Sequence, residues 1–150
     1  MTEFLETTVD KFTFKVATDR LYSDEGIWVL QEGGTRVRIG LSDFLQQRSG
    51  DVAFAEIKPE GITLTAGDEL ATIETIKVNI ELDSPLSGEV VEVNPLMELE
   101  PEHINQDPYD AGWLAVIEAA DWEMESLKLH HPRAYFDLMK NQAEEEAGNI

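Results

Sequence analysis

Short segments in which apolar and polar residues alternate dominate the first two thirds of the chain. Alternation with a period of two predicts half-buried β-strands, because successive side chains of a strand point to opposite faces of a sheet. The expected strands are residues 12–16, 27–30, 35–39, 52–57, 62–65, 89–93 and 113–118. Gly and Pro residues lie between several of these segments, as turns require. The pattern predicts a mainly β fold of the sandwich or barrel type.

Helical patterns are fewer and lie mostly at the end of the chain. Residues 42–48 predict a short helix, since Ser42 is suited to an N-cap and apolar residues follow at helical spacing. From Asp121 onward we expect a short helical piece and then a longer helix with Pro132 near its first position. Residues 144–150, which begin with three glutamates, are expected to fray into solvent.

The stretch from Glu69 to Asp83 contains no Gly or Pro and is longer than the roughly 3 to 10 residues of most strands. Its apolar residues favour odd positions up to Ile73 and even positions from Ile76, so the pleat changes face between these two. A hairpin with Lys77 near its tip satisfies both observations. No Asn-Gly or Gly-Gly pair marks the turn, so turn propensity alone does not place it.

Lys77 is one of only six lysines in the chain. It lies between Ile76 and Val78, in a run that otherwise carries acidic residues. From the residues alone, a solvent-facing strand lysine that pairs with Glu74 or Glu81 across the hairpin accounts for it.

The chain has 150 residues and a formal net charge of −20, from 31 acidic against 11 basic residues. Such a charge disfavours binding to nucleic acid and to anionic membrane surfaces. It favours partner proteins with basic docking faces, although it can equally serve to keep a small protein soluble. No apolar run approaches the roughly 20 residues of a membrane span, and residues 1–10 do not resemble a secretory signal. We expect a soluble cytoplasmic protein, with an organelle or a cleaved precursor left open.

The sequence offers no catalytic or metal-binding constellation. Without cysteine there is no disulfide, thiol nucleophile or thiolate metal site. The histidines His103, His130 and His131 lack the spacing of a zinc site. No nucleophile with a base, no paired catalytic acids and no Gly-rich phosphate loop are found, which indicates a protein that is not an enzyme in its own right. Any redox sulfur would have to come from an attached group.

Three ordered motifs resemble the glycine cleavage H-protein family. They are Glu74-Thr75-Ile76-Lys77, then Ser84-Pro85-Leu86-Ser87-Gly88-Glu89-Val90-Val91-Glu92-Val93-Asn94, and then Ile104-Asn105-Gln106-Asp107-Pro108-Tyr109 with Gly112-Trp113-Leu114. The family reads Glu-Ser-Val-Lys, then Ser-Pro-Val-Ser-Gly-Glu-Val-Val-Glu-Val-Asn, and later Asn-x-Asp-Pro-Tyr with Gly-Trp. The resemblance runs over residues 21–139. It indicates a single domain, 1–150, with an acidic helical tail at 140–150.

The resemblance implies a barrel-sandwich hybrid of two antiparallel sheets, with a short internal helix and C-terminal helices. It also implies lipoate joined by an amide bond to Lys77, on a non-catalytic carrier that moves a bound intermediate and reducing equivalents between enzymes. Glu74 matches the family glutamate and is expected either to guide the lipoate ligase or to serve the hairpin structurally. Ile76 and Val78 would form the surroundings of the arm.

Other motif residues are expected to be structural. Gly and Pro fix backbone geometry more often than they touch ligands, so Pro85, Gly88 and Asn94 are expected to shape turns. The segment that contains Asn105 and Asp107 is expected to form a structural loop beside the hairpin.

Departures from the family pattern leave the served pathway open. The family usually has His-Glu-Trp where this chain has Glu25-Gly26-Ile27-Trp28, and Lys-Ala-Ala where it has Lys77-Val78-Asn79. A strand-like N-terminus is also added. One hypothesis is glycine cleavage, with an aminomethyl cargo and with glycine decarboxylase, aminomethyltransferase and dihydrolipoyl dehydrogenase as partners. The other is sulfur oxidation with heterodisulfide-reductase-like subunits, as in divergent lipoate-binding relatives.

Two further alternatives concern the attached group. One is an interaction module that keeps the fold but carries no group. The other is a biotinyl carrier, which is less favoured because the biotinyl lysine usually lies in Met-Lys-Met, whereas Lys77 lies between Ile76 and Val78.

Overall fold

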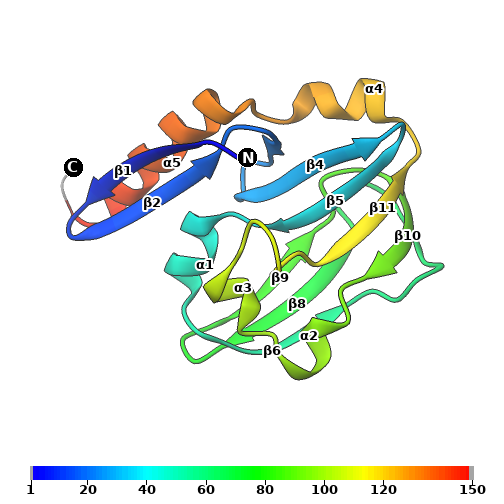
Figure 1. Cartoon of the computed structure of the whole chain (residues 1–150), viewed down its shortest axis with the longest axis horizontal. Helices are drawn as coiled ribbons and strands as arrows, with labels where there is room; N and C mark the ends of the chain where they lie inside the picture. The colour runs from blue at the N-terminus through cyan, green and yellow to red at the C-terminus, as the bar shows by residue number, and fades with distance from the viewer. Residues whose placement is uncertain (1, 149–150) are drawn as a thin grey trace.

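The computed structural model describes residues 2–148, which form antiparallel sheets flanked by helices (Figure 1). The strands are β1 (Phe4–Val9), β2 (Phe12–Ala17), β3 (Leu21–Tyr22), β4 (Ile27–Gly33), β5 (Arg36–Leu41), β6 (Val52–Ile57), β7 (Thr63–Leu64), β8 (Glu69–Thr75), β9 (Asn79–Asp83), β10 (Gly88–Val93) and β11 (Ala115–Ala119). The helices are α1 (Asp43–Ser49), α2 (Leu96–Leu99), α3 (His103–Gln106), α4 (Trp122–Glu125), the 3-10 helix η1 (Ser126–Lys128) and α5 (Pro132–Glu146). The prediction of a mainly β fold is confirmed.

Two sheets form the body of the molecule. The larger has six strands in the order β3-β4-β5-β11-β10-β7, and the smaller has three in the order β6-β8-β9. All strand pairs in both sheets are antiparallel. This is the barrel-sandwich arrangement expected from the sequence. A third, two-stranded sheet, the N-terminal hairpin β1-β2, is added to it.

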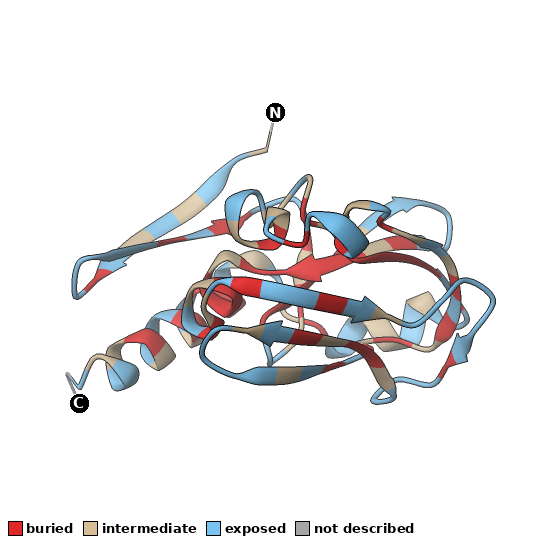
Figure 2. Ribbon diagram, turned by 90° about the horizontal axis from the view of Figure 1, so that it is seen from below, coloured by how far each residue is buried: buried red, intermediate tan, exposed pale blue. Residues whose placement is uncertain are grey.

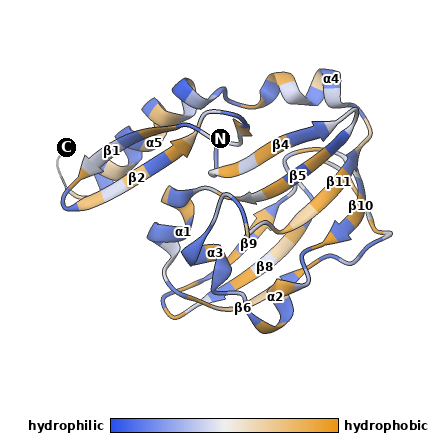
Figure 3. Cartoon of the chain, viewed as in Figure 1, coloured by the Kyte–Doolittle hydropathy of each residue, from blue (hydrophilic) through white to orange (hydrophobic). Residues whose placement is uncertain are grey.

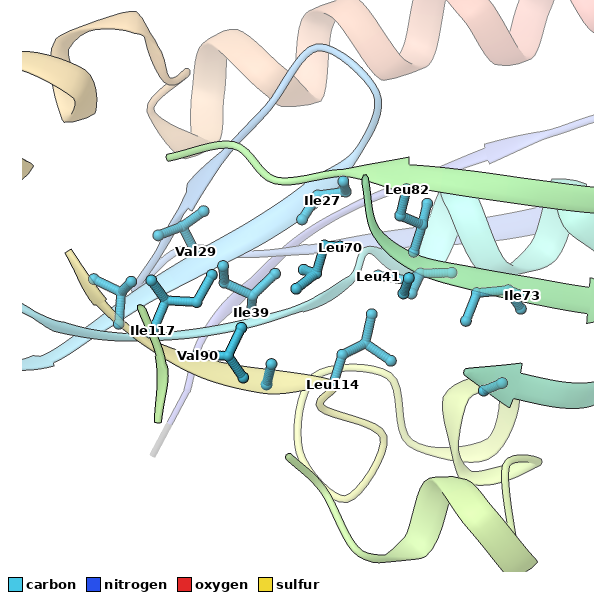
Figure 4. Packing of buried hydrophobic residues seen from close by; sticks show 14 of the residues in the cluster. Ile27, Val29, Ile39, Leu41, Leu70, Ile73, Leu82, Val90, Leu114 and Ile117 are labelled. Atoms are coloured by element: carbon cyan, nitrogen blue, oxygen red, sulfur yellow. The ribbon is translucent and has the colours of Figure 1, made fainter. Parts of the chain in front are cut away.

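The main core lies between the six-stranded and the three-stranded sheet. Ile39 and Ile117 come from the larger sheet, Ile73 and Leu82 come from the smaller one, and all four are buried (Figure 4). Buried and exposed residues alternate along many of the strands (Figure 2), and hydropathy varies along them in a similar way (Figure 3). Each large apolar side chain buried in this way contributes about 1.5–3 kcal/mol to the stability of the fold.

A second apolar cluster joins the N-terminal hairpin to helices α1 and α5. Its buried members include Phe14 of β2, Phe44 of α1 and Phe136 of α5. The rings of Phe14 and Phe44 meet edge to face with centroids 5.3 Å apart. The hairpin therefore packs against α1 and α5, and it lies beside α5 (Figure 1).

Helix α1 forms where the sequence predicts it. Ser42 is the N-cap, and its side-chain oxygen accepts a hydrogen bond from the Leu45 amide at 3.3 Å. The same hydroxyl lies 3.0 Å from the hydroxyl of the buried Tyr135 of α5. Burial raises the pKa of Tyr135 to about 12, because the charged phenolate is disfavoured inside the apolar cluster.

Helix α5 begins with Pro132 at its first turn, as predicted. Residues 144–146 belong to this helix, so the prediction that they fray is wrong; residues 149–150 lie outside the described part of the chain. The physical reason is tertiary: the end of α5 packs on the N-terminal hairpin, and Glu146 forms an ion pair with Arg48 of α1. No helix within residues 2–148 is long and apolar enough to cross a membrane.

Candidate functional site

Lys77 lies in the turn between β8 and β9, as predicted. The hydroxyl of Thr75 accepts hydrogen bonds from the amides of Lys77 at 3.2 Å and Val78 at 3.0 Å. The Thr75 amide donates to the Val78 carbonyl at 2.8 Å and closes the turn. A threonine side chain can thus organise a turn that contains neither Gly nor Pro, which is why the usual dipeptide signals were missing.

Ile76 and Val78 do not continue the apolar face of the strands. Their side chains are 77% and 44% exposed. The interpretation of a pleat that changes face was therefore wrong for these two residues, since they belong to the turn and point to solvent. Ile73 and Ile80 are cross-strand partners that face the core together, so the hairpin itself is as predicted.

The side chain of Lys77 lies against the end of helix α1. Its Nζ donates a hydrogen bond to the carbonyl of Arg48 at 3.2 Å. Among the described residues it forms no ion pair with Glu74 or Glu81, so the cross-strand pairing considered above was wrong. Glu74 is exposed and lies opposite Asn79. A cation at the carbonyl end of a helix is favourable, which accounts for the position of the ammonium group.

The loop beneath Lys77 is held by Asn105, from the third motif. The Asn105 side-chain amide donates to the Gln46 side chain and to the Gly50 carbonyl, both at 3.0 Å, and its oxygen accepts from the Val52 amide at 2.8 Å. The structural role expected for Asn105 is therefore confirmed, although the residue lies in the short helix α3 and not in a loop as predicted. Gly50 has a φ of 95°, and a Cβ there would lie 3.3 Å from Cδ of Lys77. Glycine both permits this backbone conformation and leaves room for the lysine stem.

A groove of about 270 Å³ opens beside Lys77. Its walls come from the N-terminal hairpin, from α1 and from the end of α5. The lining includes Phe12, Phe14, Phe44, Arg48, Lys77 and Glu146. Arg48 and Glu146 form an ion pair of 2.8 Å between α1 and α5. Sequence reasoning did not find this groove, because it joins four segments that are separated along the chain.

The other motif residues shape the framework. Gly88 is needed because a Cβ there would lie 2.2 Å from the Glu118 carbonyl oxygen of the neighbouring strand. Asn94 donates hydrogen bonds to the carbonyls of Ala111 and Trp113 at 2.8 and 2.7 Å. Both residues are structural, as expected, but Gly88 lies in strand β10, so the prediction that it shapes a turn was wrong. Asn94 follows β10, where the chain leaves the strand. Within residues 2–148 no cluster of His, Asp and Glu could hold a metal ion.

Comparison with known proteins decides the family. A family model described as glycine cleavage H-protein matches residues 20–142. The chain belongs to the glycine cleavage H-protein family. Lipoate, attached covalently to a lysine, is the cofactor of this family.

The relatives and a solved structure agree with this membership. The glycine cleavage system H protein of Oceanobacillus iheyensis is 44% identical over 103 residues, which cover 69% of this chain and 81% of the relative. The glycine cleavage system H protein 4 of Aquifex aeolicus is 39% identical over 134 residues, which cover 89% of this chain and 77% of the relative. A crystal structure of the glycine cleavage system H protein of Mycobacterium marinum superposes with a TM-score of 0.64 at 31% identity, over 69% of this chain and 85% of that chain.

The site fits the cofactor of the H-protein family. An amide on a lysine needs a primary amine that an enzyme can reach, and Lys77 is an exposed lysine at a hairpin tip. The turn is fixed by hydrogen bonds to Thr75, and the Ile76 amide donates to the Asp51 carbonyl at 3.0 Å. These hydrogen bonds hold the backbone of Lys77 in place, and its side chain extends from that fixed base to the amine.

Proposed function

We propose that Lys77 is the lipoyl attachment site and that this chain is a non-catalytic carrier subunit of the glycine cleavage system. The observation that carries the proposal is the position of Lys77 at the tip of a hydrogen-bonded hairpin, in the motif Glu74-Thr75-Ile76-Lys77. Bound lipoate would supply a dithiolane that accepts electrons and carries a group between enzymes. The protein chain itself supplies a fixed anchor for it.

Each residue of the turn has a defined part in this proposal. Thr75 fixes the backbone so that the lysine points away from the core. Amide formation removes the charge of Lys77 and leaves a single N–H, which weakens the hydrogen bond to the Arg48 carbonyl and makes it easier for the side chain to leave the end of α1. Glu74, exposed beside the turn, is proposed to contact the ligase. Ile76 and Val78 surround the base of the arm with exposed apolar surface.

Intact-mass measurement tests the attachment site. The purified chain is incubated with a lipoate ligase, ATP and lipoate, and we expect a mass increase of one lipoyl group. Lys77→Ala should abolish the increase, whereas Lys58→Ala, which removes another exposed lysine, should leave it unchanged. A mass increase that survives Lys77→Ala would show that another residue is modified.

Binding measurements test the pathway. We propose glycine decarboxylase, aminomethyltransferase and dihydrolipoyl dehydrogenase as partners, together with the enzymes that attach lipoate, because the relatives bear the glycine cleavage name. The lipoylated chain should bind glycine decarboxylase and should be reduced or reoxidised by its partner enzymes. Binding to heterodisulfide-reductase-like subunits in preference to glycine decarboxylase would instead support the sulfur-oxidation hypothesis, which stays a prediction from sequence.

A further inference from the structure

The N-terminal hairpin lies before the part of the chain that the family model matches. Strands β1 and β2 lie before residue 20, where the match to the family model begins. The hairpin nevertheless contributes a wall to the groove beside Lys77, through Phe12 and Phe14. The Phe12 side chain is 59% exposed, whereas Phe14, two residues along β2, is buried. A segment outside the family match therefore places an exposed aromatic ring at the site.

Exposed apolar side chains lie on both sides of Lys77. Ile76 and Val78 flank it in the turn, and Phe12 shares a groove with it. Contiguous exposed apolar surface marks an interaction site, and Lys77 is the residue that the turn of Ile76 and Val78 shares with the groove that Phe12 lines. A few well-packed side chains near the centre carry most of the binding energy of a protein interface.

The position of the lysine amine indicates which protein must cover this surface. Nζ of Lys77 lies against the Arg48 carbonyl, beside the hairpin wall. An enzyme that forms a bond to Nζ has to bring its active site to that atom, and so has to meet the residues around it. Enzymes that act on the far end of an attached arm can stay an arm's length away. The surface around Lys77 is therefore best suited to the attaching enzyme.

The charges around the site define the partner further. Asp10, Asp51 and Glu74 are exposed around the turn and the groove, on a chain with a net charge of −20, whereas Glu146 is paired with Arg48. Complementary charge raises the rate of encounter and fixes the orientation of the partners. The partner is expected to have an apolar contact area with basic residues around it.

We propose that Phe12, Ile76 and Val78 form the docking surface for the enzyme that attaches the lipoyl group, with the N-terminal hairpin as an added part of that surface. The proposal rests on the proposed function of Lys77. In the reaction, Nζ forms an amide bond with the carbonyl carbon of a lipoyl adenylate, and the bond from that carbon to the phosphate breaks. The nucleotide leaves with the electron pair as AMP, and the ammonium group of Lys77 releases two protons.

Steady-state kinetics of lipoylation, followed by intact mass, test the docking surface. Phe12→Ser and Ile76→Ser remove exposed side chains, so both variants should fold, which circular dichroism checks. Leu99→Ser is the matched control, because Leu99 is 85% exposed and lies on α2. We expect the KM for the carrier to rise five- to tenfold in Phe12→Ser and Ile76→Ser and to change less than twofold in Leu99→Ser. The KM of the wild-type chain should also rise with salt concentration.

The outcomes separate this proposal from the one on which it rests. If the wild-type chain gains no lipoyl group, the proposed function fails and the docking surface fails with it. If the chain is lipoylated on Lys77 and Phe12→Ser has the same KM as Leu99→Ser, the hairpin is no part of the docking surface and only the further inference is overturned.

Discussion

Replacement of Asn105 by Ala should destabilise the fold and loosen the loop beneath Lys77. The side chain makes three hydrogen bonds, with Gln46, Gly50 and Val52, at 2.8–3.0 Å. Each such bond contributes about 1 kcal/mol, and its loss costs more where the partner stays buried. Because Asn105 is half-buried, water can replace part of what is lost. We therefore expect Asn105→Ala to lower the free energy of unfolding by about 2–3 kcal/mol.

Urea and thermal denaturation, followed by circular dichroism, measure this loss. For a chain of this size a loss of about 2–3 kcal/mol corresponds to a fall in Tm of roughly 4–12 °C. Asn105→Asp keeps the oxygen that accepts from the Val52 amide but removes both donated hydrogen bonds, so its effect should be different from that of Ala. Hydrogen exchange should quicken at Val52 and at Ile76, whose amide is bonded to the neighbouring Asp51 carbonyl. A loss below about 0.5 kcal/mol, the lower end for one hydrogen bond, would refute the assignment of Asn105 as the support of this loop.

Three further changes have expected outcomes. Gly88→Ala should prevent normal folding or lower Tm sharply, because its Cβ would lie 2.2 Å from the Glu118 carbonyl oxygen; soluble expression and calorimetry check this. Lipoylation of Lys77 removes a cation from the carbonyl end of α1, so the modified chain should be less stable by about 0.3–1 kcal/mol at low salt, and urea denaturation should show the difference shrinking as salt is added. Partial burial is the main cause of a raised pKa at Glu25, and the nearby charge of Asp83 raises this pKa further. The charged form of Glu25 therefore opposes folding. Glu25→Gln should therefore raise Tm at pH 7, and the gain should vanish as the pH falls below the ordinary glutamate pKa, where the wild-type carboxyl is protonated in both states.

Local patterns were sufficient to predict most elements of the fold. Alternation predicted the strands because one face of each sheet packs on the core, and Ser42 predicted the start of α1 because its hydroxyl can accept a backbone hydrogen bond. Helices α2 and α3 were not predicted, since each has only four residues and too few turns to show an apolar period. Strand β11 was predicted to begin at residue 113, and it begins at Ala115.

The candidate site could be predicted only in part. The length of the segment from Glu69 to Asp83 and the family motif placed Lys77 at a hairpin tip, and the structure agrees. The contact of Lys77 with the Arg48 carbonyl and the groove beside it could not be predicted, because they depend on how α1, the N-terminal hairpin and α5 pack together. Sequence periodicity describes which face of an element is buried, but it does not describe which distant element covers that face.

The turn that holds Lys77 is stiff. It contains a β-branched residue on each side of the lysine and no glycine, and the Thr75 hydroxyl binds two of its amides. A tether that starts from a stiff anchor explores a volume fixed by its own length, and the effective concentration of its free end follows from that volume. The encounter rate of an arm on Lys77 with a docked enzyme would therefore be set by the chemistry of the arm and the geometry of docking, with little contribution from motion of the protein backbone.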